Sequence, residues 1–173
     1  PANMNYLTGY DGWSFYVHQG VIVSLDRDEP FWFGRKQDSN GARLTTYLRD
    51  DSIYGYADEY VQSRYTHTMV YVAGMLNELG LADRHLGVEM DNYWFSARML
   101  LTLQRELPGT RILDANNLVN WVKTVKAAPE IEYMRQAARI CERVMQTAVD
   151  GIEVGAWEKD VTAAVVAAQI AGT

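Results

Sequence analysis

The residues able to do chemistry are few in this chain and lie far apart. Its three histidines are His18, His67 and His85, and none of them stands in a His-x-x-x-His pattern. A zinc site needs several nitrogen, sulfur or oxygen ligands close together, so this spacing argues against zinc. The single cysteine, Cys141, falls on the apolar stripe of a predicted helix, which predicts a buried, unreactive thiol rather than a nucleophile.

The acidic residues form two small groups. Asp26, Asp28 and Glu29 lie in a polar turn and lack the dense ligand spacing of a calcium loop, so we interpret them as solvated. Glu89 and Asp91 follow a predicted strand, where α/β proteins often bind ligands, although capping of the next helix by Asp91 explains that carboxylate equally well. Glycine-rich phosphate loops are absent. The sequence therefore predicts no catalytic residue and no metal ligand within these 173 residues.

Aromatic residues are concentrated in one stretch near the beginning. Residues 6–12 are aromatic and glycine-rich, which is typical of a loop that bends tightly. Residues 15–25 are rich in β-branched and aromatic side chains, which predicts a largely buried strand. Two interpretations remain open: a loop and strand that present aromatics to a ligand, or a core strand preceded by a packed aromatic turn.

Composition narrows the class of protein. Hydrophobic residues make up 48% and charged residues 22%, which is ordinary for a globular domain. The net charge of −6 disfavours nucleic acid and anionic membranes as partners, because both need a basic face. One cysteine permits no internal disulfide and fits a reducing, cytoplasmic compartment. No apolar run reaches the roughly 20 residues that span a bilayer, and no signal peptide is evident. Eleven Tyr and five Trp favour a small-molecule site or a dimer interface.

The periodicity predicts strands that alternate with helices. The strand at 15–25 and a second at 30–34 form a hairpin, which makes the sheet mixed. Further elements are a short helix at 42–48, a strand at 53–56, a loop at 57–68, a helix at 69–79, a strand at 85–89, a helix at 93–107 capped by Asp91 or Asn92, and a strand at 111–114. This order predicts an α/β domain with helices flanking a mixed sheet.

The character of the chain changes near Lys126. Helices are predicted from Pro129 to about residue 150, with an apolar stripe that includes Cys141, and at 157–171. Their unpartnered apolar faces indicate the start of a second domain. We therefore expect a first domain at 1–125 and the beginning of a truncated second domain at 126–173. Because the chain opens on Pro1 and enters ordered-looking sequence at once, we also expect an earlier helix and strand to precede the first domain.

Three pieces of sequence together resemble the creatinase/prolidase family. Residues 3–10, NMNYLTGY, resemble the N-x-x-Y-L-T-G-aromatic signature of its N-terminal domain, and residues 86–89, LGVE, resemble a later I-G-x-E strand. Residues 125–138, VKAAPEIEYMRQAA, resemble the K-S-P-x-E-I-x-x-M-R-x-A entry to the pita-bread catalytic domain, with Ala127 in place of the usual serine. The resemblance implies an N-terminal α/β domain related in topology to ribonuclease H, followed by the first helices of a pita-bread domain.

Within that family the chain is most similar to ectoine hydrolases, which open the cyclic amidine of ectoine. This similarity rests on residues 9–19, GYDGWSFYVHQ, residues 88–93, VEMDNY, and residues 120–121, NW. In creatinase-like members the matching loop and strand reach substrate, which implies that Trp13, Phe15, Tyr16 and His18 bind it. Phe15 is the direct match by position, whereas Tyr16 and His18 depart from the residues of creatinase. Strand alternation would place at most about half of the four on one side.

The resemblance leaves three functions open. The first is an ectoine hydrolase whose catalytic residues lie beyond Thr173; the second is a metal-dependent Xaa-Pro dipeptidase or aminopeptidase, or a creatinase-like amidinohydrolase. The third is a non-catalytic binding module. Peptidase members hold two divalent metals in the second domain and creatinase-like members hold none, and family homodimers often place one N-terminal domain over the other active site. We expect a homodimer acting on a small molecule, and an inactive chain when residues 1–173 stand alone.

Overall fold

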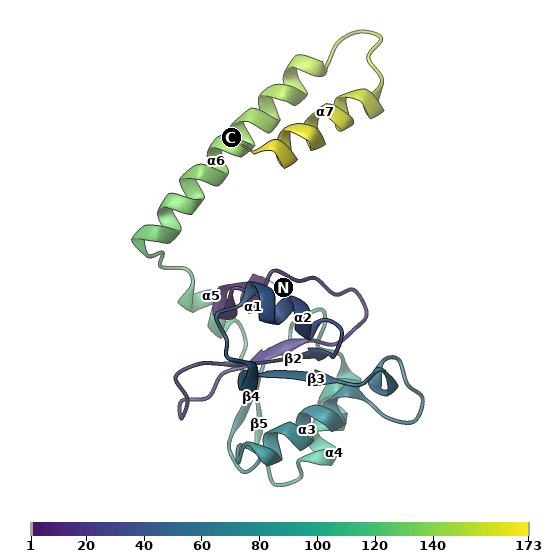
Figure 1. Ribbon diagram of the computed structural model, residues 1–173, viewed down its shortest axis with the longest axis vertical. Coiled ribbons are helices and arrows are strands. Elements are labelled where there is room, and N and C mark those ends of the chain that lie inside the picture. The colour runs from purple at the N-terminus through teal and green to yellow at the C-terminus, as the bar shows by residue number, and fades with distance from the viewer. Residues whose placement is uncertain (1, 173) are drawn as a thin grey trace. The chain divides into compact units, whose positions relative to one another are not determined.

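The computed structural model describes residues 2–172 and divides the chain into two compact units, residues 1–123 and 124–173. The first unit contains both helices and strands (Figure 1). Its helices are α1 (Ala2–Thr8), α2 (Ser39–Thr45), α3 (Thr68–Glu78), α4 (Ala97–Glu106) and α5 (Leu118–Val122), with single 3-10 turns η1 (Asp50–Ser52) and η2 (Asp58–Tyr60). Its strands are β1 (Gly20–Ile22), β2 (Phe31–Arg35), β3 (Ile53–Tyr56), β4 (Leu86–Val88) and β5 (Ile112–Asp114).

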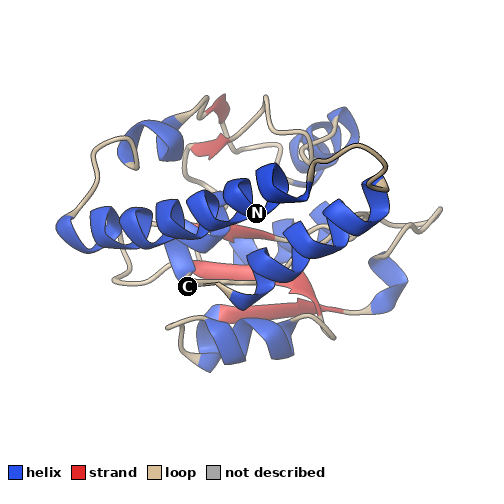
Figure 2. Ribbon diagram, turned by 90° about the horizontal axis from the view of Figure 1, so that it is seen from above, coloured by secondary structure: helices blue, strands red, loops and turns tan. Residues whose placement is uncertain are grey.

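The strands, drawn in red in Figure 2, form a mixed arrangement. β1 and β2 are antiparallel, with Ile22 opposite Phe31, so the predicted hairpin is confirmed. β2 and β3 are parallel, and β4 and β5 form a separate parallel pair. The α/β class with a mixed sheet and flanking helices is therefore confirmed, although the described strands belong to two sheets, in the orders β1-β2-β3 and β4-β5.

The core follows the two-residue period of β2. Phe31 and Phe33 point to one face of the sheet and pack in a cluster with the buried side chains of α3 and α4. Trp32 points to the other face and packs with Tyr10 and with Ala42 of α2. Helices thus cover both faces of β2, which is why all three of its aromatic residues are buried.

Helix α3 agrees with its predicted bounds to within one residue at each end. Of the apolar positions predicted at helical spacing, four (Met69, Val72, Ala73 and Leu76) are buried, and the fifth, Leu79, is partly buried. The helix begins after His67, whose ring accepts a hydrogen bond from the Met69 N–H, and Gly80 follows its end with a φ of +68°.

Two predictions at the start of the chain are wrong. The stretch at 6–12 is not all loop, because α1 continues to Thr8, whose hydroxyl donates to the Met4 carbonyl, and ends at Gly9 with a φ of +79°. The strand predicted at 15–25 is limited to Gly20–Ile22. The Ser14 hydroxyl accepts from the Val17 N–H and donates to the Val17 carbonyl, and this turn interrupts the extended backbone.

Helix α4 begins later than predicted. Its N-cap is Ser96, which accepts from the Met99 N–H, so capping by Asp91 or Asn92 is wrong. The Asn92 side chain instead accepts from the Trp94 N–H, and this bond forms a local turn that precedes the start of α4. Residues 93–95 therefore lie outside the helix.

The second unit consists of α6 (Ala128–Gly151) and α7 (Glu158–Ala171), close to the predicted ranges. Residues of α6 at helical spacing, including Ile140 and Val144, are partly buried, and the predicted stripe through Cys141 is offset from them. Cys141 is exposed, so the prediction of a buried thiol is wrong. In residues 2–172 no helix is both long enough and apolar enough to cross a bilayer.

Candidate functional site: an exposed aromatic loop

Residues 11–18 form an irregular loop, which we call the aromatic loop. Trp13, Phe15 and Tyr16 are 70%, 75% and 54% exposed. The Trp13 and Phe15 rings lie with their centroids 6.0 Å apart and their planes tilted by 31°. Large aromatic side chains left exposed together are uncommon on a protein surface and mark a place where something binds.

The base of the aromatic loop is fastened to the core at both ends. Before the loop, Tyr10 is buried against Trp32, with ring centroids 5.2 Å apart, and its hydroxyl lies 2.9 Å from the Gln19 Oε1 that follows the loop. Burial, aided by the charge of Asp38, raises the pKa of Tyr10 to about 12, so its phenol keeps the proton that it donates to Gln19. At the other end the buried Tyr56 hydroxyl donates to the His18 carbonyl.

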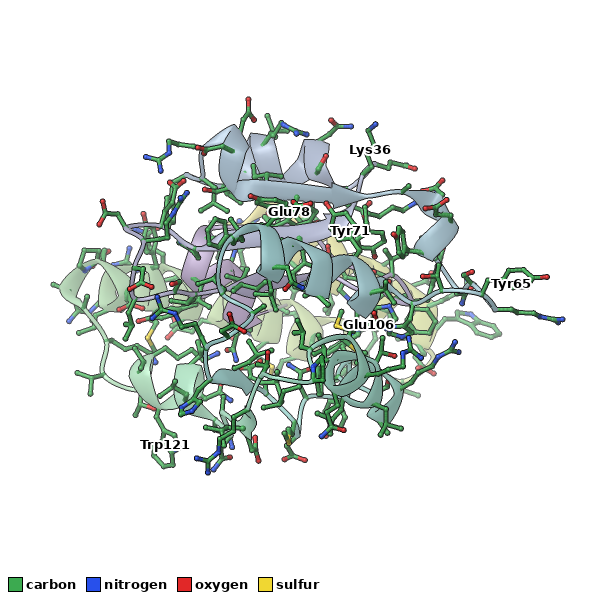
Figure 3. The ribbon with its side chains drawn as sticks, turned by 90° about the horizontal axis from the view of Figure 1, so that it is seen from below. Lys36, Tyr65, Tyr71, Glu78, Glu106 and Trp121 are labelled. Atoms are coloured by element: carbon green, nitrogen blue, oxygen red, sulfur yellow. The ribbon has the colours of Figure 1, made fainter. Side chains whose placement is uncertain are left out.

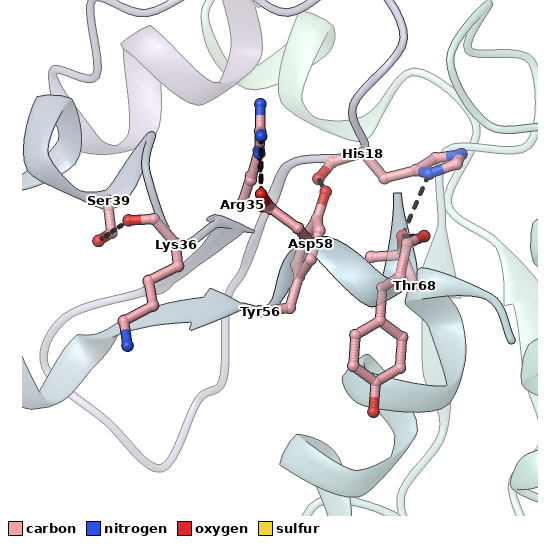
Figure 4. A network of polar contacts seen from close by, with 8 residues as sticks. His18, Arg35, Lys36, Ser39, Tyr56, Asp58 and Thr68 are labelled. Carbon is pink, nitrogen blue, oxygen red and sulfur yellow. Dashed lines mark hydrogen bonds and ion pairs between the residues drawn. The ribbon is translucent and has the colours of Figure 1, made fainter. Parts of the chain in front are cut away.

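The His18 side chain points inward from the loop, unlike the three exposed aromatics. Its Nδ1 lies 3.3 Å from the Thr68 hydroxyl, a contact that the dashed line in Figure 4 marks, and its ring centroid lies 5.0 Å from that of His67. Burial lowers the pKa of His18 below its usual value, so the imidazole is neutral near pH 7. A neutral imidazole has one donor and one acceptor nitrogen, and Thr68 engages one of them.

The side chain of His67 caps the start of helix α3. Its Nδ1 accepts from the Met69 N–H at 3.2 Å, which fixes the start of α3. Burial lowers the pKa of His67 to about 4, aided by the positive charges of Arg98 and Arg105 and by repulsion from His18 whenever that ring is also protonated. A neutral ring is needed here, because a protonated Nδ1 could not accept the capping hydrogen bond.

A charged pair lies close to the aromatic loop. Arg35 Nε and Nη2 donate to the two carboxylate oxygens of Asp58 at 2.7 and 2.9 Å (Figure 4). These bonds hold the pKa of Asp58 below its usual range and raise the pKa of Arg35. Tyr16 also contributes to raising the pKa of Arg35. The pair was not singled out from the sequence, because Arg35 and Asp58 lie 23 residues apart and neither belongs to a motif.

The four residues expected to bind substrate are not all placed alike. Phe15, Tyr16 and His18 line a cavity of about 680 Å³ in the first unit, and Trp13 does not line it. Because 13–18 is a loop, strand alternation does not decide which of these side chains share a side. Whether the four contact substrate stays a prediction.

Glu89 also lines this cavity. Its two carboxylate oxygens accept from the side-chain amides of Asn3, at 2.6 Å, and Asn92, at 3.1 Å. The sequence indicated Glu89 as a carboxylate at a strand end and Asn3 as part of the signature at residues 3–10, but it did not indicate that these two residues, 86 positions apart, are in contact. Among the residues described, no three His, Cys, Asp or Glu side chains lie together as a metal site would require.

Comparison with known proteins supplies the relationship that the geometry alone does not. A family model for the creatinase/prolidase N-terminal domain matches residues 1–125. An ectoine hydrolase from Halomonas elongata is 48% identical over 156 residues, which cover 90% of this chain and 39% of the relative. An uncharacterized hydrolase/peptidase, y4tM, from Sinorhizobium fredii is 45% identical over 173 residues, covering 100% of this chain and 44% of the relative.

A solved structure agrees with the fold. The X-Pro aminopeptidase from Thermotoga maritima superposes with a TM-score of 0.70 at 17% identity, over 99% of this chain and 43% of that one. This chain thus spans less than half the length of the relatives it matches. The resemblance seen in the sequence motifs is confirmed, and the chain belongs to the creatinase/prolidase family.

Proposed function

We propose that the full-length protein is an ectoine hydrolase, which opens the cyclic amidine of ectoine to an acetylated diaminobutyrate. The observation that carries the proposal is the 48% identity to an ectoine hydrolase over 90% of this chain. The catalytic residues lie beyond Thr173, so residues 1–173 alone are inactive. The chain has a single cysteine and therefore no internal disulfide, which fits a reducing compartment and supports a cytoplasmic enzyme.

In this proposal the aromatic loop helps to enclose the substrate. Protonated ectoine carries a delocalised positive charge, and aromatic faces attract such cations. Trp13, Phe15 and Tyr16 are exposed and free to stack on a ligand, and the neutral His18 behind them offers a ring nitrogen. The loop acts across a homodimer, over the active site of the partner subunit.

The first experiment is a turnover assay of the full-length protein on ectoine, Gly-Pro and creatine, each with and without a chelator. Hydrolysis of ectoine alone supports the proposal. Hydrolysis of Gly-Pro that the chelator abolishes would replace it with a peptidase holding two divalent metals, an alternative that the hydrolase/peptidase relative favours. Turnover of none of the three would favour a non-catalytic binding module.

The second experiment tests the aromatic loop itself. Trp13→Ala and Phe15→Ala should each raise KM for ectoine by roughly 2- to 30-fold, since a cation–aromatic contact contributes about 0.5–2 kcal/mol. Tyr65→Ala is the matched control, because Tyr65 is a 99% exposed aromatic outside the loop that projects away from the chain (Figure 3). An unchanged KM in both loop variants would remove these rings from the site.

A further inference from the structure

A chain of polar contacts joins three distant parts of the first unit. Asn3, in the first turn of α1, donates from its side-chain amide to a Glu89 carboxylate oxygen at 2.6 Å. The amide oxygen of Asn3 accepts from the Lys123 ammonium, also at 2.6 Å. Glu89 directly follows β4 and Lys123 directly follows α5, so one asparagine bridges residues that lie 86 and 120 positions from it.

The charges at the two ends of this chain of contacts suit the amide between them. The amide nitrogen of Asn3 faces a carboxylate and its oxygen faces an ammonium, whereas the reverse orientation would place donor against donor and acceptor against acceptor. Hydrogen bonds to ionised groups are shorter and stronger than those between neutral groups. Asn3, Glu89 and Lys123 are all partly buried, which strengthens these bonds further.

Lys123 is the residue at which the first unit ends, and the second unit begins at Thr124. Helix α5, which Lys123 follows, is five residues long, and none of the residues Leu118–Val122 is buried. A helix this short is not stable by itself, and its exposed side chains provide little packing to hold it in place. The contact with Asn3 therefore holds the end of α5 in the first unit.

We propose that Asn3 is a positioning residue. Through Lys123 it fixes the point at which the chain leaves the first unit, and the covalent connection carries that constraint to the start of the second unit. The proposal rests on the proposed function in one respect, since the aromatic loop belongs to the first unit and the catalytic residues lie beyond Thr173. A loose connection would reduce the fraction of molecules in which the aromatic loop meets the substrate.

The same contacts connect the pieces of sequence that resemble the creatinase/prolidase family. Asn3 belongs to the piece at 3–10 and Glu89 to the piece at 86–89, and Lys123 lies two residues before the piece at 125–138. The residue types in these pieces did not indicate a chemical role for Asn3. The contacts give it a role that requires no contact with substrate.

Amide hydrogen exchange of the full-length protein, measured without substrate, tests the first step of the proposal. The Trp121 N–H donates to the Asn117 carbonyl at 2.9 Å and closes the first turn of α5, so its exchange rate reports how often α5 opens. Asn3→Ala and Lys123→Met should each speed this exchange about 10-fold. The double variant should exchange no faster than either single variant, because both substitutions remove the same contact.

Asn92→Ser is the matched control for exchange. Asn92 donates to the other oxygen of Glu89 at 3.1 Å, so this variant removes a bond to the same carboxylate and leaves the rest of the chain of contacts intact. Serine also keeps an acceptor for the local turn. The control should change Trp121 exchange by less than about 2-fold, and the N–H of buried Val72 should keep its rate in every variant.

Three exchange results would overturn the proposal. Trp121 exchange that Asn3→Ala leaves unchanged would show that Asn3 does not hold α5. An equal rise in the control or at Val72 would show a general loss of stability. Additive effects in the double variant would show that Asn3 does not act through Lys123.

Kinetics of the same variants test the second step. Asn3→Ala and Lys123→Met should raise KM for ectoine by a common factor and leave kcat unchanged, because saturating substrate selects the molecules whose aromatic loop is in place. A merely destabilised protein would contain fewer active molecules, which lowers kcat and leaves KM unchanged. Faster Trp121 exchange with an unchanged KM would overturn the positioning role. If the full-length protein turns over Gly-Pro or creatine instead, the proposed function fails, and KM for that substrate takes the place of KM for ectoine.

Discussion

Two short stretches of this chain have almost the same composition and opposite surroundings. In β2, Phe31, Trp32 and Phe33 are 1%, 0% and 8% exposed. In the aromatic loop, three rings within four residues are 54–75% exposed. The type of side chain does not distinguish them, since both stretches consist of bulky aromatics.

The backbone does distinguish them. β2 is paired on both sides, with β1 and with β3, and helices cover both faces of the sheet. The aromatic loop has a turn at Ser14–Val17, and among the described residues it is paired with no strand, so its backbone is not held in the sheet. Aromatic residues are thus buried where their backbone is already paired, and an unpaired aromatic stretch becomes a contact surface.

The largest effect on stability should come from a substitution in the buried strand β2. Trp32→Ala should lower the free energy of unfolding by about 3–5 kcal/mol, because it leaves a cavity between the sheet and α2. Trp32→Phe should cost less, since it keeps a ring and removes an Nε1 that has no hydrogen-bond partner among the described residues. Denaturant unfolding of the full-length protein measures both. Equal, small effects would mean that the core does not depend on β2.

The bond that ties the loop to the core should matter next. Tyr56→Phe removes the buried hydroxyl that donates to the His18 carbonyl, which should cost about 1–3 kcal/mol of stability and raise KM. Tyr47→Phe is its control, because the Tyr47 hydroxyl donates to the Leu7 carbonyl at 2.7 Å from an exposed ring. The control should change stability by less than about 0.5 kcal/mol. If both variants behave alike, the loop is not held by Tyr56.

Acid should weaken the fold through His67. Its pKa is about 4 in the folded protein and ordinarily 6.5, so the unfolded chain binds the proton first as pH falls. The contribution of His67 is present above pH 6.5 and declines as pH is lowered from 6.5 toward 4.

His67→Asn should flatten this part of the curve of unfolding free energy against pH, because asparagine keeps a capping oxygen and does not titrate. His67→Ala should cost about 1 kcal/mol at pH 7 by removing the cap of α3. A curve that His67→Asn leaves unchanged would assign the acid sensitivity to other groups.

The exposed member of the comparison should give the smallest effect on stability. Phe15→Ala should change the free energy of unfolding by no more than about 0.5 kcal/mol, because its ring is 75% exposed. A loss of more than about 1.5 kcal/mol would show that Phe15 is packed in the full-length protein.

Much of the fold follows from local sequence. The helices α3, α6 and α7 and the β1–β2 hairpin were predicted because periodicity and turn residues act over a few positions. The strand at 15–25 was too long because β propensity indicates where backbone can extend, and pairing with a distant strand decides where it does. Helix α1 was missed because Asn and Thr are weak helix formers, and burial of Thr8 supports them here.

At the candidate site, too, local sequence indicated some features and could not indicate others. Residue types and family resemblance indicated Trp13, Phe15, Tyr16 and His18 as neighbours along the chain. Neither could indicate that His18 turns inward to Thr68, or that Asn3 reaches Glu89, since these contacts join residues 50 and 86 positions apart. Contacts of that kind depend on how the sheet and helices pack, which no local pattern specifies.

The hydrogen bond between Tyr10 and Gln19 joins the two ends of the aromatic loop before any ligand binds. Ordering a free loop around a substrate would cost conformational entropy for each immobilised residue, and this loop has already lost much of that freedom during folding. Its rings are thus preorganised, so more of each stacking contact is retained as affinity. Loss of this hydrogen bond, as in Tyr10→Phe, would make the same aromatic rings bind a ligand more weakly without removing any of them.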